Sequence, residues 1–192
     1  MKKIEFLFLG MIAALGALVI IVTAVVTVQI FLPEGQETAI GAYLHLPAFI
    51  IFAVIAEEFF KYLFISKKLA AHKTGRSLIV DAVFLGSGFA LAEILFISLN
   101  NYPTENAYRN ILEIATVHIS TSVIIAWPFL TNSSRKFLKI SLALLVATGA
   151  HLSYNLLSLG EMDFLSSLLS ALLFLLILTA ILKAKRLEKS LA

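Results

Sequence analysis

The sequence predicts an all-α membrane protein, a polytopic bundle of six transmembrane helices with both termini in the cytoplasm. Three observations lead to this fold class. The 192 residues are 60% hydrophobic and 14% charged, whereas soluble domains are usually about half apolar and about one quarter charged. The chain contains six apolar stretches near the length of about 20 residues that a membrane-spanning helix needs. Its basic residues recur at every second boundary between these stretches.

The first three predicted spans cover residues 4–32, 43–66 and 78–99. The first ends at a turn that begins with Pro33. Its β-branched residues do not argue against a helix, because a backbone inside a bilayer must satisfy its own hydrogen bonds. Pro47 lies in the first turns of the second span, where a missing N–H costs least. Each stretch is therefore expected to form one helix.

The last three predicted spans cover residues 108–130, 138–159 and 164–182. Polar segments separate them, and Gly160 begins the turn between the final two. A basic tail is expected after the sixth span. No composition shift or linker divides the chain, so residues 1–192 are predicted to form a single domain.

The positions of lysine and arginine orient the predicted bundle. Cytoplasmic loops are enriched in both residues. All but two of the 15 lie at the N-terminus, between spans 2 and 3, between spans 4 and 5 or at the first residues of span 5, or after span 6; the exceptions are Lys61 and Arg109. Both termini are therefore expected in the cytoplasm, and the chain in the plasma membrane. Nucleic acid is not expected as a partner, and the lack of cysteine excludes disulfides and thiolate catalysis.

Three charged residues interrupt the second span, in the segment V-I-A-E-E-F-F-K-Y-L-F. They are Glu57, Glu58 and Lys61. A charge at the bilayer centre costs at least about 2.5–3.5 kcal/mol, so these side chains are expected to face the protein interior. Lys61 follows the two glutamates by four and three residues, spacings that bring side chains together on a helix. An internal ion pair would account for one carboxylate only, and the other needs a further partner.

Each of the next three spans also carries a buried protonatable group: Glu93, His118 and His151, the last followed on the same face by Asn155. Each group taken singly has an ordinary explanation as an interhelical hydrogen bond. Four consecutive spans carry such groups, however, whereas the first and last spans carry none. We therefore expect them to meet in one water-containing pocket. Such a set can bind a metal ion or activate a water molecule by general base catalysis.

Four short motifs within a motif core at residues 43–159 follow an order that resembles the PrsW-type intramembrane proteases, relatives of the CAAX-type prenyl endopeptidases. Each motif is weak alone, and the signal comes from their order on successive spans. The motifs are Glu57-Glu58-Phe-Phe-Lys61 for EExxK, Phe89-Ala-Leu-Ala-Glu93 for FxxxE, His118 for the lone histidine, and His151-Leu-Ser-Tyr-Asn155 for the final histidine motif. The CAAX-type enzymes have EExxxR and FxxxH, so the lysine and the third glutamate place this chain nearer the PrsW type.

The resemblance implies a protease that cuts a membrane protein or lipid-anchored peptide in or near the bilayer. It implies that a glutamate of the first motif, with Glu57 as first choice over Glu58, acts with His151 to activate a water molecule. Lys61 would then fix the second carboxylate. The identity of the substrate is not implied.

The resemblance also implies roles for the remaining motif residues. His118 and Asn155 would polarise the peptide carbonyl or bind the oxyanion. Glu93 stands where the CAAX-type enzymes have histidine, and it would orient a histidine or join a metal. PrsW-like proteins are often described as metalloproteases, whereas the CAAX relatives work without a metal. Both options, a divalent metal such as zinc or no cofactor, therefore stay open.

Two functions of other classes are compatible with the same residues. A small transporter or proton-linked channel would use them as a relay, although no repeat symmetry is evident in the sequence. A non-catalytic scaffold or immunity-type membrane protein would use them for packing. Alanine variants would lose activity in a protease and stability in a scaffold.

Overall fold

The computed structural model describes residues 3–31, 47–69, 76–99, 107–130 and 135–191. No β-strand occurs in these ranges, and the all-α fold class is confirmed. The α-helices are α1 (Lys3–Ile30), α3 (Pro47–Phe64), α4 (Arg76–Leu99), α5 (Ala107–Ala126), α6 (Lys136–Leu159) and α7 (Asp163–Leu191).

Each predicted span contains one of these helices. A π-helical turn at Ile65–Leu69 prolongs α3, and a 3-10 turn at Trp127–Leu130 prolongs α5 through Pro128. The end of the first predicted span at Leu32 and residues 43–46 of the second lie outside the described residues. The tail after residue 182 differs from expectation, because α7 continues to Leu191. Lysine, arginine, leucine and glutamate dominate this tail, and all four favour helix in water as well as in lipid.

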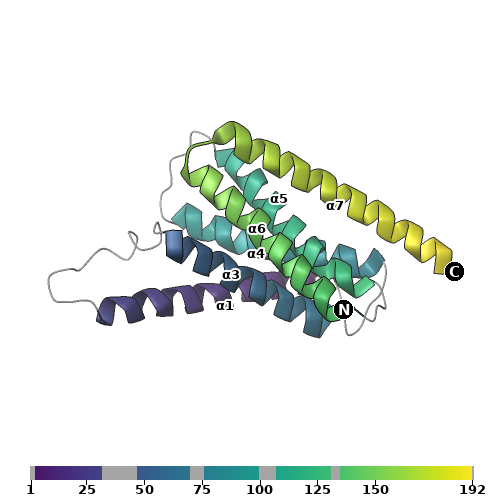
Figure 1. Cartoon of the computed structure of the whole chain (residues 1–192), viewed down its shortest axis with the longest axis horizontal. Coiled ribbons are helices and arrows are strands. Elements are labelled where there is room, and N and C mark those ends of the chain that lie inside the picture. The colour runs from purple at the N-terminus through teal and green to yellow at the C-terminus, as the bar shows by residue number, and fades with distance from the viewer. Residues whose placement is uncertain (1–2, 32–46, 70–75, 100–106, 131–134, 192) are drawn as a thin grey trace.

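The six helices pack side by side in one bundle (Figure 1). Helices α1 and α7 lie at opposite edges, and α3, α4, α5 and α6 lie between them. Helix α5 contacts α4, α6 and α7, while α3 contacts α1, α6 and α5. The start of α1 and the end of α7 lie at the same end of the bundle. The four inner helices are those that carry the predicted motif residues.

Glycines allow α1 and α4 to approach closely. A Cβ atom built on Gly88 of α4 would lie 1.8 Å from the carbonyl oxygen of Leu7, and one on Gly10 of α1 would lie 2.0 Å from that of Leu85. Both distances are far below van der Waals contact, so no larger residue fits without moving a helix backbone. Small residues at such contacts are typical of helix pairs in membranes.

An apolar core occupies the end of the bundle where the termini lie. Phe6, Ile65, Leu78, Leu85 and Ile125 are among its members, and all are at most 1% exposed. They come from α1, the turn after α3, α4 and α5. This core therefore separates the middle of the bundle from the end that carries the termini.

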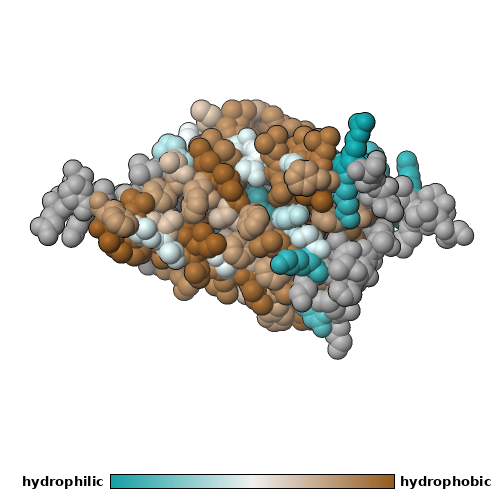
Figure 2. Space-filling model, turned by 60° about the horizontal axis from the view of Figure 1, so that its bottom comes forward, coloured by the Kyte–Doolittle hydropathy of each residue, from teal (hydrophilic) through white to brown (hydrophobic). Residues whose placement is uncertain are grey.

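The face of the molecule shown in Figure 2 is apolar over most of its length. Hydrophilic side chains gather mainly at the end that holds the termini. Exposed side chains include Phe137, Leu145 and Phe164, at 84%, 71% and 77% exposure. Five helices (α1, α4, α5, α6 and α7) are long and apolar enough to cross a membrane. The chain therefore has the character of a membrane protein, and α3 is set apart by its three charged residues.

Candidate active site

Lys61 connects α3 to its neighbours. Its Nζ donates a hydrogen bond to Glu58 Oε1 at 2.7 Å and another to Thr121 Oγ1 of α5 at 2.8 Å. The same ammonium lies 4.7 Å from the centre of the Phe89 ring of α4, within cation–π range. Lys61 and Glu58 are both at most 1% exposed. Of the two adjacent glutamates, it is therefore Glu58 whose carboxylate is paired with this cation.

Glu58 also holds His151 of α6. The distance from His151 Nδ1 to Glu58 Oε1 is 2.7 Å. Because an ionised carboxylate only accepts hydrogen bonds, Nδ1 carries the hydrogen and donates it. The other ring nitrogen of a neutral imidazole, Nε2, is then an acceptor. It lies 3.6 Å from Glu57 Oε2, and the Glu57 side chain is 19% exposed.

His118 of α5 is held in a similar way from α4. Its Nε2 is hydrogen-bonded to Glu93 Oε2. The imidazole stacks on Phe89, with ring centres 4.8 Å apart, and meets His151 edge-on at 4.9 Å. By the same reasoning as for His151, Nε2 donates to the carboxylate and Nδ1 is left as an acceptor. Each histidine therefore has one nitrogen fixed by a glutamate and one nitrogen free.

Three side chains with potential ligand atoms converge. Glu57, His118 and His151 each present one potential ligand atom, and these atoms lie within 4.8 Å of one another. Glu57 Oε2 and His118 Nδ1 are buried and have no hydrogen-bond partner among the described residues. Buried polar atoms without a partner are rare in proteins. The space between the three side chains is therefore suited to a water molecule, a substrate group or an ion.

The charge of this cluster points to the same conclusion. Its three glutamates and one lysine leave two negative charges when both histidines are neutral. Uncompensated charge is costly in apolar surroundings. Two additional protons on the cluster, or one divalent cation, would cancel it. An occupant that supplies positive charge or donates hydrogen bonds is thus favoured over one that accepts them.

The residue types at this site are those that bind zinc, and the distances between their ligand atoms show whether an ion fits without movement. Zinc binds histidine and glutamate at about 2.0–2.2 Å, and its histidines commonly donate their other N–H to a carboxylate, as His151 and His118 do here. Since no two of the three atoms are more than 4.8 Å apart, one point lies within about 2.8 Å of all of them, which is a hydrogen-bond distance. The three groups therefore suit a water molecule as they stand, and a zinc ion after the side chains move inward.

The structure brings together six of the seven residues expected at the site. Asn155 is the exception: it lies one turn beyond His151 on α6 and is half-buried, and within the described ranges no hydrogen bond or ion pair joins it to the others. Thr121 was not expected. It lies three residues after His118 and so on the same helix face, a spacing that could have identified it. The six residues are Glu57, Glu58, Lys61, Glu93, His118 and His151.

A separate cavity of about 500 Å³ lies between α5, α6 and α7, and none of the six residues lines it. Comparison with protein-family models, curated proteins and solved structures gives no significant match to this chain. Functional inference therefore depends on the geometry of the buried cluster and on the order of the motifs.

Proposed function

We propose that the chain is an intramembrane endopeptidase of the PrsW/CAAX type that hydrolyses a peptide bond in a membrane protein or lipid-anchored peptide. The observation that supports this most is the convergence of the Glu57, His118 and His151 side chains on one space. Two atoms of these side chains, Glu57 Oε2 and His118 Nδ1, are buried without a partner in the described protein. A cluster that served packing alone would be expected to pair its buried polar atoms. The order of the four motifs gives the reaction class.

In the proposed reaction a water molecule beside Glu57 Oε2 and His151 Nε2 donates one hydrogen bond to each. Glu57 takes a proton from the water as the water oxygen forms a bond to the peptide carbonyl carbon. The proton then passes to the amide nitrogen as the C–N bond breaks and the amine leaves. Glu58 fixes the imidazole of His151 through Nδ1. Lys61 neutralises Glu58, so that Glu57 remains the carboxylate free to act as the base. Glu57 Oε2 and His151 Nε2 are separated by 3.6 Å, close enough for one water molecule to contact both atoms.

His118 and Asn155 are proposed to contact the substrate carbonyl. Once protonated at Nδ1, His118 can donate to the oxyanion, with its orientation set by Glu93. Asn155 lies on the same face of α6 as His151, where a substrate extending along the helix would reach it. A zinc ion, when bound, would be held by Glu57, His118 and His151, and would act as a Lewis acid.

We further propose that α3 is a sixth membrane-spanning helix, with both termini on the cytoplasmic face of the plasma membrane. The charged side chains of α3 do not oppose this, because Glu58 and Lys61 are buried against other helices. The common position of the two chain ends supports an even number of spans. The basic residues near these ends support the orientation.

The proposal can be tested with purified protein in vesicles that also contain membrane proteins extracted from the producing cells. New peptide N-termini are identified by mass spectrometry. Wild type is expected to generate them, and Glu57→Gln and His151→Asn to reduce their rate of formation by at least about 10²-fold, the contribution of a general base. Glu161→Gln is the matched control, because Glu161 is exposed in the turn between α6 and α7.

Thermal unfolding of the same variants separates catalysis from packing. Glu57 forms no hydrogen bond with the described residues, so Glu57→Gln should unfold at the wild-type temperature while losing cleavage. Undiminished cleavage by Glu57→Gln, or no cleavage by wild type, would contradict the proposal. Metal analysis decides the cofactor: one zinc per chain that is lost in His118→Ala would assign the ion to this site.

A proton-linked channel is less well supported than a protease. A proton path would need polar groups across the whole bundle, whereas the described buried side chains toward the chain termini are mainly apolar, with Asp81 a buried charged residue next to them in α4. Leu78, Leu85 and Ile125 in this core are at most 1% exposed. Proton flux through reconstituted vesicles that Glu57→Gln abolishes would favour the channel instead.

A further inference from the structure

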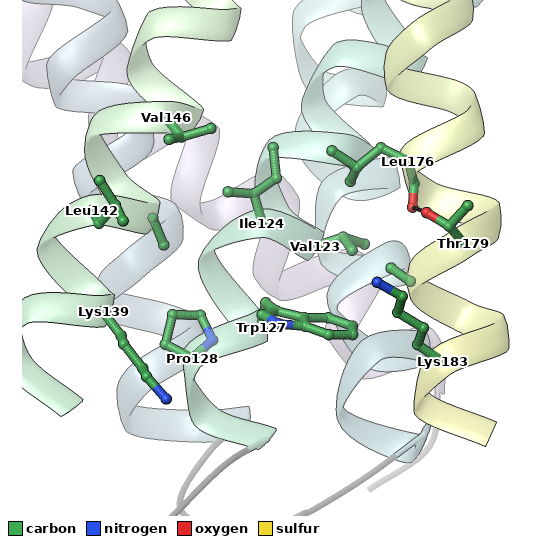
Figure 3. A pocket seen from close by; sticks show the side chains of 12 residues that line it. Val123, Ile124, Trp127, Pro128, Lys139, Leu142, Val146, Leu176, Thr179 and Lys183 are labelled. Carbon is green, nitrogen blue, oxygen red and sulfur yellow. Dashed lines mark hydrogen bonds between the residues drawn. The ribbon is translucent and has the colours of Figure 1, made fainter. Parts of the chain in front are cut away.

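The cavity between α5, α6 and α7 has two chemically different parts (Figure 3). Its volume of about 500 Å³ is within the range of roughly 300–1,000 Å³ typical of small-ligand sites. Apolar side chains line most of it, including Leu142 and Val146 of α6 and Leu176 of α7. Toward one end Lys139 lies beside Pro128 and Lys183 beside Trp127, on opposite sides of the indole. The cavity is therefore mainly apolar, with two lysines toward one end.

The two lysines occupy equivalent depths on antiparallel helices. Lys139 lies about one turn after the start of α6. The apolar span of α7 ends at Arg186, and Lys183 lies about one turn before that end. Neither lysine forms an ion pair with any of the described residues, and no acidic side chain lines the cavity. Their positive charges are thus available to an external anion at the level where lipid headgroups begin.

We propose that this cavity binds one anionic phospholipid of the bilayer, with an acyl chain between α6 and α7 and the headgroup phosphate between Lys139 and Lys183. Basic pockets between transmembrane helices are known to select anionic headgroups. The cavity is continuous with lipid-facing surface, because Leu142 and Val146 are 58% and 48% exposed. Trp127 lies beside the lysines, at the depth where tryptophan favours the membrane interface.

A lipid fits these features better than a protein partner does. A phospholipid matches both parts at once, since it carries a phosphate next to a long apolar chain. A peptide or a second copy of the chain would need a complementary acidic group beside an apolar helix. The site is also distinct from the buried glutamate and histidine cluster, so the inference does not depend on the proposed protease activity.

The chain contains a single tryptophan, and that residue lines the cavity. Bromine atoms on a lipid acyl chain quench tryptophan fluorescence on contact. Purified protein is reconstituted in phosphatidylcholine vesicles that contain a rising fraction of either brominated phosphatidylglycerol or brominated phosphatidylcholine. The fraction that gives half-maximal quenching of Trp127 measures the relative affinity of the cavity for each headgroup.

Wild type is expected to prefer the brominated phosphatidylglycerol by roughly 25-fold, since each lysine near an anionic headgroup contributes roughly a factor of five. Lys139→Gln/Lys183→Gln should remove this preference. Lys185→Gln/Arg186→Gln removes the same charge from exposed positions outside the cavity. This variant should retain most of the preference for phosphatidylglycerol. Ala143→Phe, which fills the cavity, should reduce quenching by either lipid, whereas Ala171→Phe on the exposed side of α7 should not.

Equal quenching by the two brominated lipids in wild type would overturn the proposal. The same loss of preference in both double variants would also overturn it, because the charge of the whole surface would then be responsible rather than the cavity. Thermal unfolding temperatures of the variants serve as the check on folding. If quenching of Trp127 by both lipids decreases as the protein concentration in the vesicles rises, a second copy of the chain fills the cavity. This result would count against the lipid.

Discussion

The buried ammonium of Lys61 makes three contacts, one to each of three helices. It bonds to Glu58 within α3 and to Thr121 on α5, and it lies over Phe89 on α4. Buried ion pairs contribute little to stability as a pair, but the loss of one partner leaves the other charge uncompensated. Glu58 would then have only His151 as a partner.

Replacing Lys61 with methionine, which is similar in size and apolar, is therefore expected to lower the free energy of unfolding by about 3–5 kcal/mol. Lys61→Met/Glu58→Gln should recover part of this loss, because both charges are then absent. Lys185→Met, at an exposed position on α7, is the control. Thermal unfolding in detergent measures all three. A double variant no more stable than Lys61→Met would show that the pairing is not the cause.

Residue spacing predicted contacts within a helix better than contacts between helices. The spacing of three between Glu58 and Lys61 indicated that they could pair, and they do. The sequence did not decide between the two glutamates, because both spacings are compatible with a helix face. The bond from Lys61 to Thr121 depends on how α3 and α5 are rotated against each other, which no local pattern encodes.

At the scale of whole elements, the contact between α1 and α4 depends on two glycines. Gly88 of α4 lies against the backbone of Leu7, and Gly10 of α1 lies against that of Leu85. Helix α4 contributes Glu93 to the buried cluster, where it holds His118. Helix α1 contributes none of the six residues of the cluster. Helix α1 therefore acts on the site through the positions that it imposes on α4 and α3, both of which it contacts.

Gly88→Ala is expected to destabilise the protein by about 1–3 kcal/mol, because the added methyl group would overlap the carbonyl of Leu7 unless the helices separate. Gly149→Ala is the matched variant. It lies in the interior of α6 with nothing within 4 Å of the added Cβ, and it should be neutral or stabilising by up to about 1 kcal/mol. Equal unfolding temperatures for the two variants would be inconsistent with close packing of α1 on α4.

Helix boundaries were predicted well where apolar residues give way to turn residues. The end of α6 at Leu159 is followed by Gly160, as expected. Helix α7 continues to Leu191, past the end predicted for the sixth span at Leu182, and the prediction concerned the apolar span rather than the end of the helix. The backbone hydrogen bonds of a helix continue wherever the residues favour them, and the charged residues after Leu182 do so.

At the scale of the whole molecule, the all-α architecture followed from composition alone, but the number of spans did not. Five helices meet the length and polarity expected of membrane spans. Helix α3 is the case that composition cannot settle, because its three charges are acceptable only where other helices cover them. The proposed six-span topology therefore depends on tertiary contacts as well as hydropathy.

Single cysteines can locate the loops, because the chain has no cysteine of its own. Glu161→Cys is expected to react with a membrane-impermeant maleimide in intact cells. Lys3→Cys and Arg186→Cys should react only after the membrane is permeabilised, since both lie at the basic end of the bundle. Labelling of these two from opposite faces would require an odd number of spans.

The covering of α3 by later helices has a consequence for biosynthesis. The residues that hydrogen-bond to Lys61 and Glu58 from outside α3 are Thr121 and His151, which leave the ribosome long after α3 does. Until they arrive, α3 would expose ionised groups to hydrocarbon, at a cost of at least about 2.5–3.5 kcal/mol each. Helix α3 is therefore expected to wait at the translocon or the membrane surface, and to enter the lipid together with α5 and α6 rather than in the order of translation.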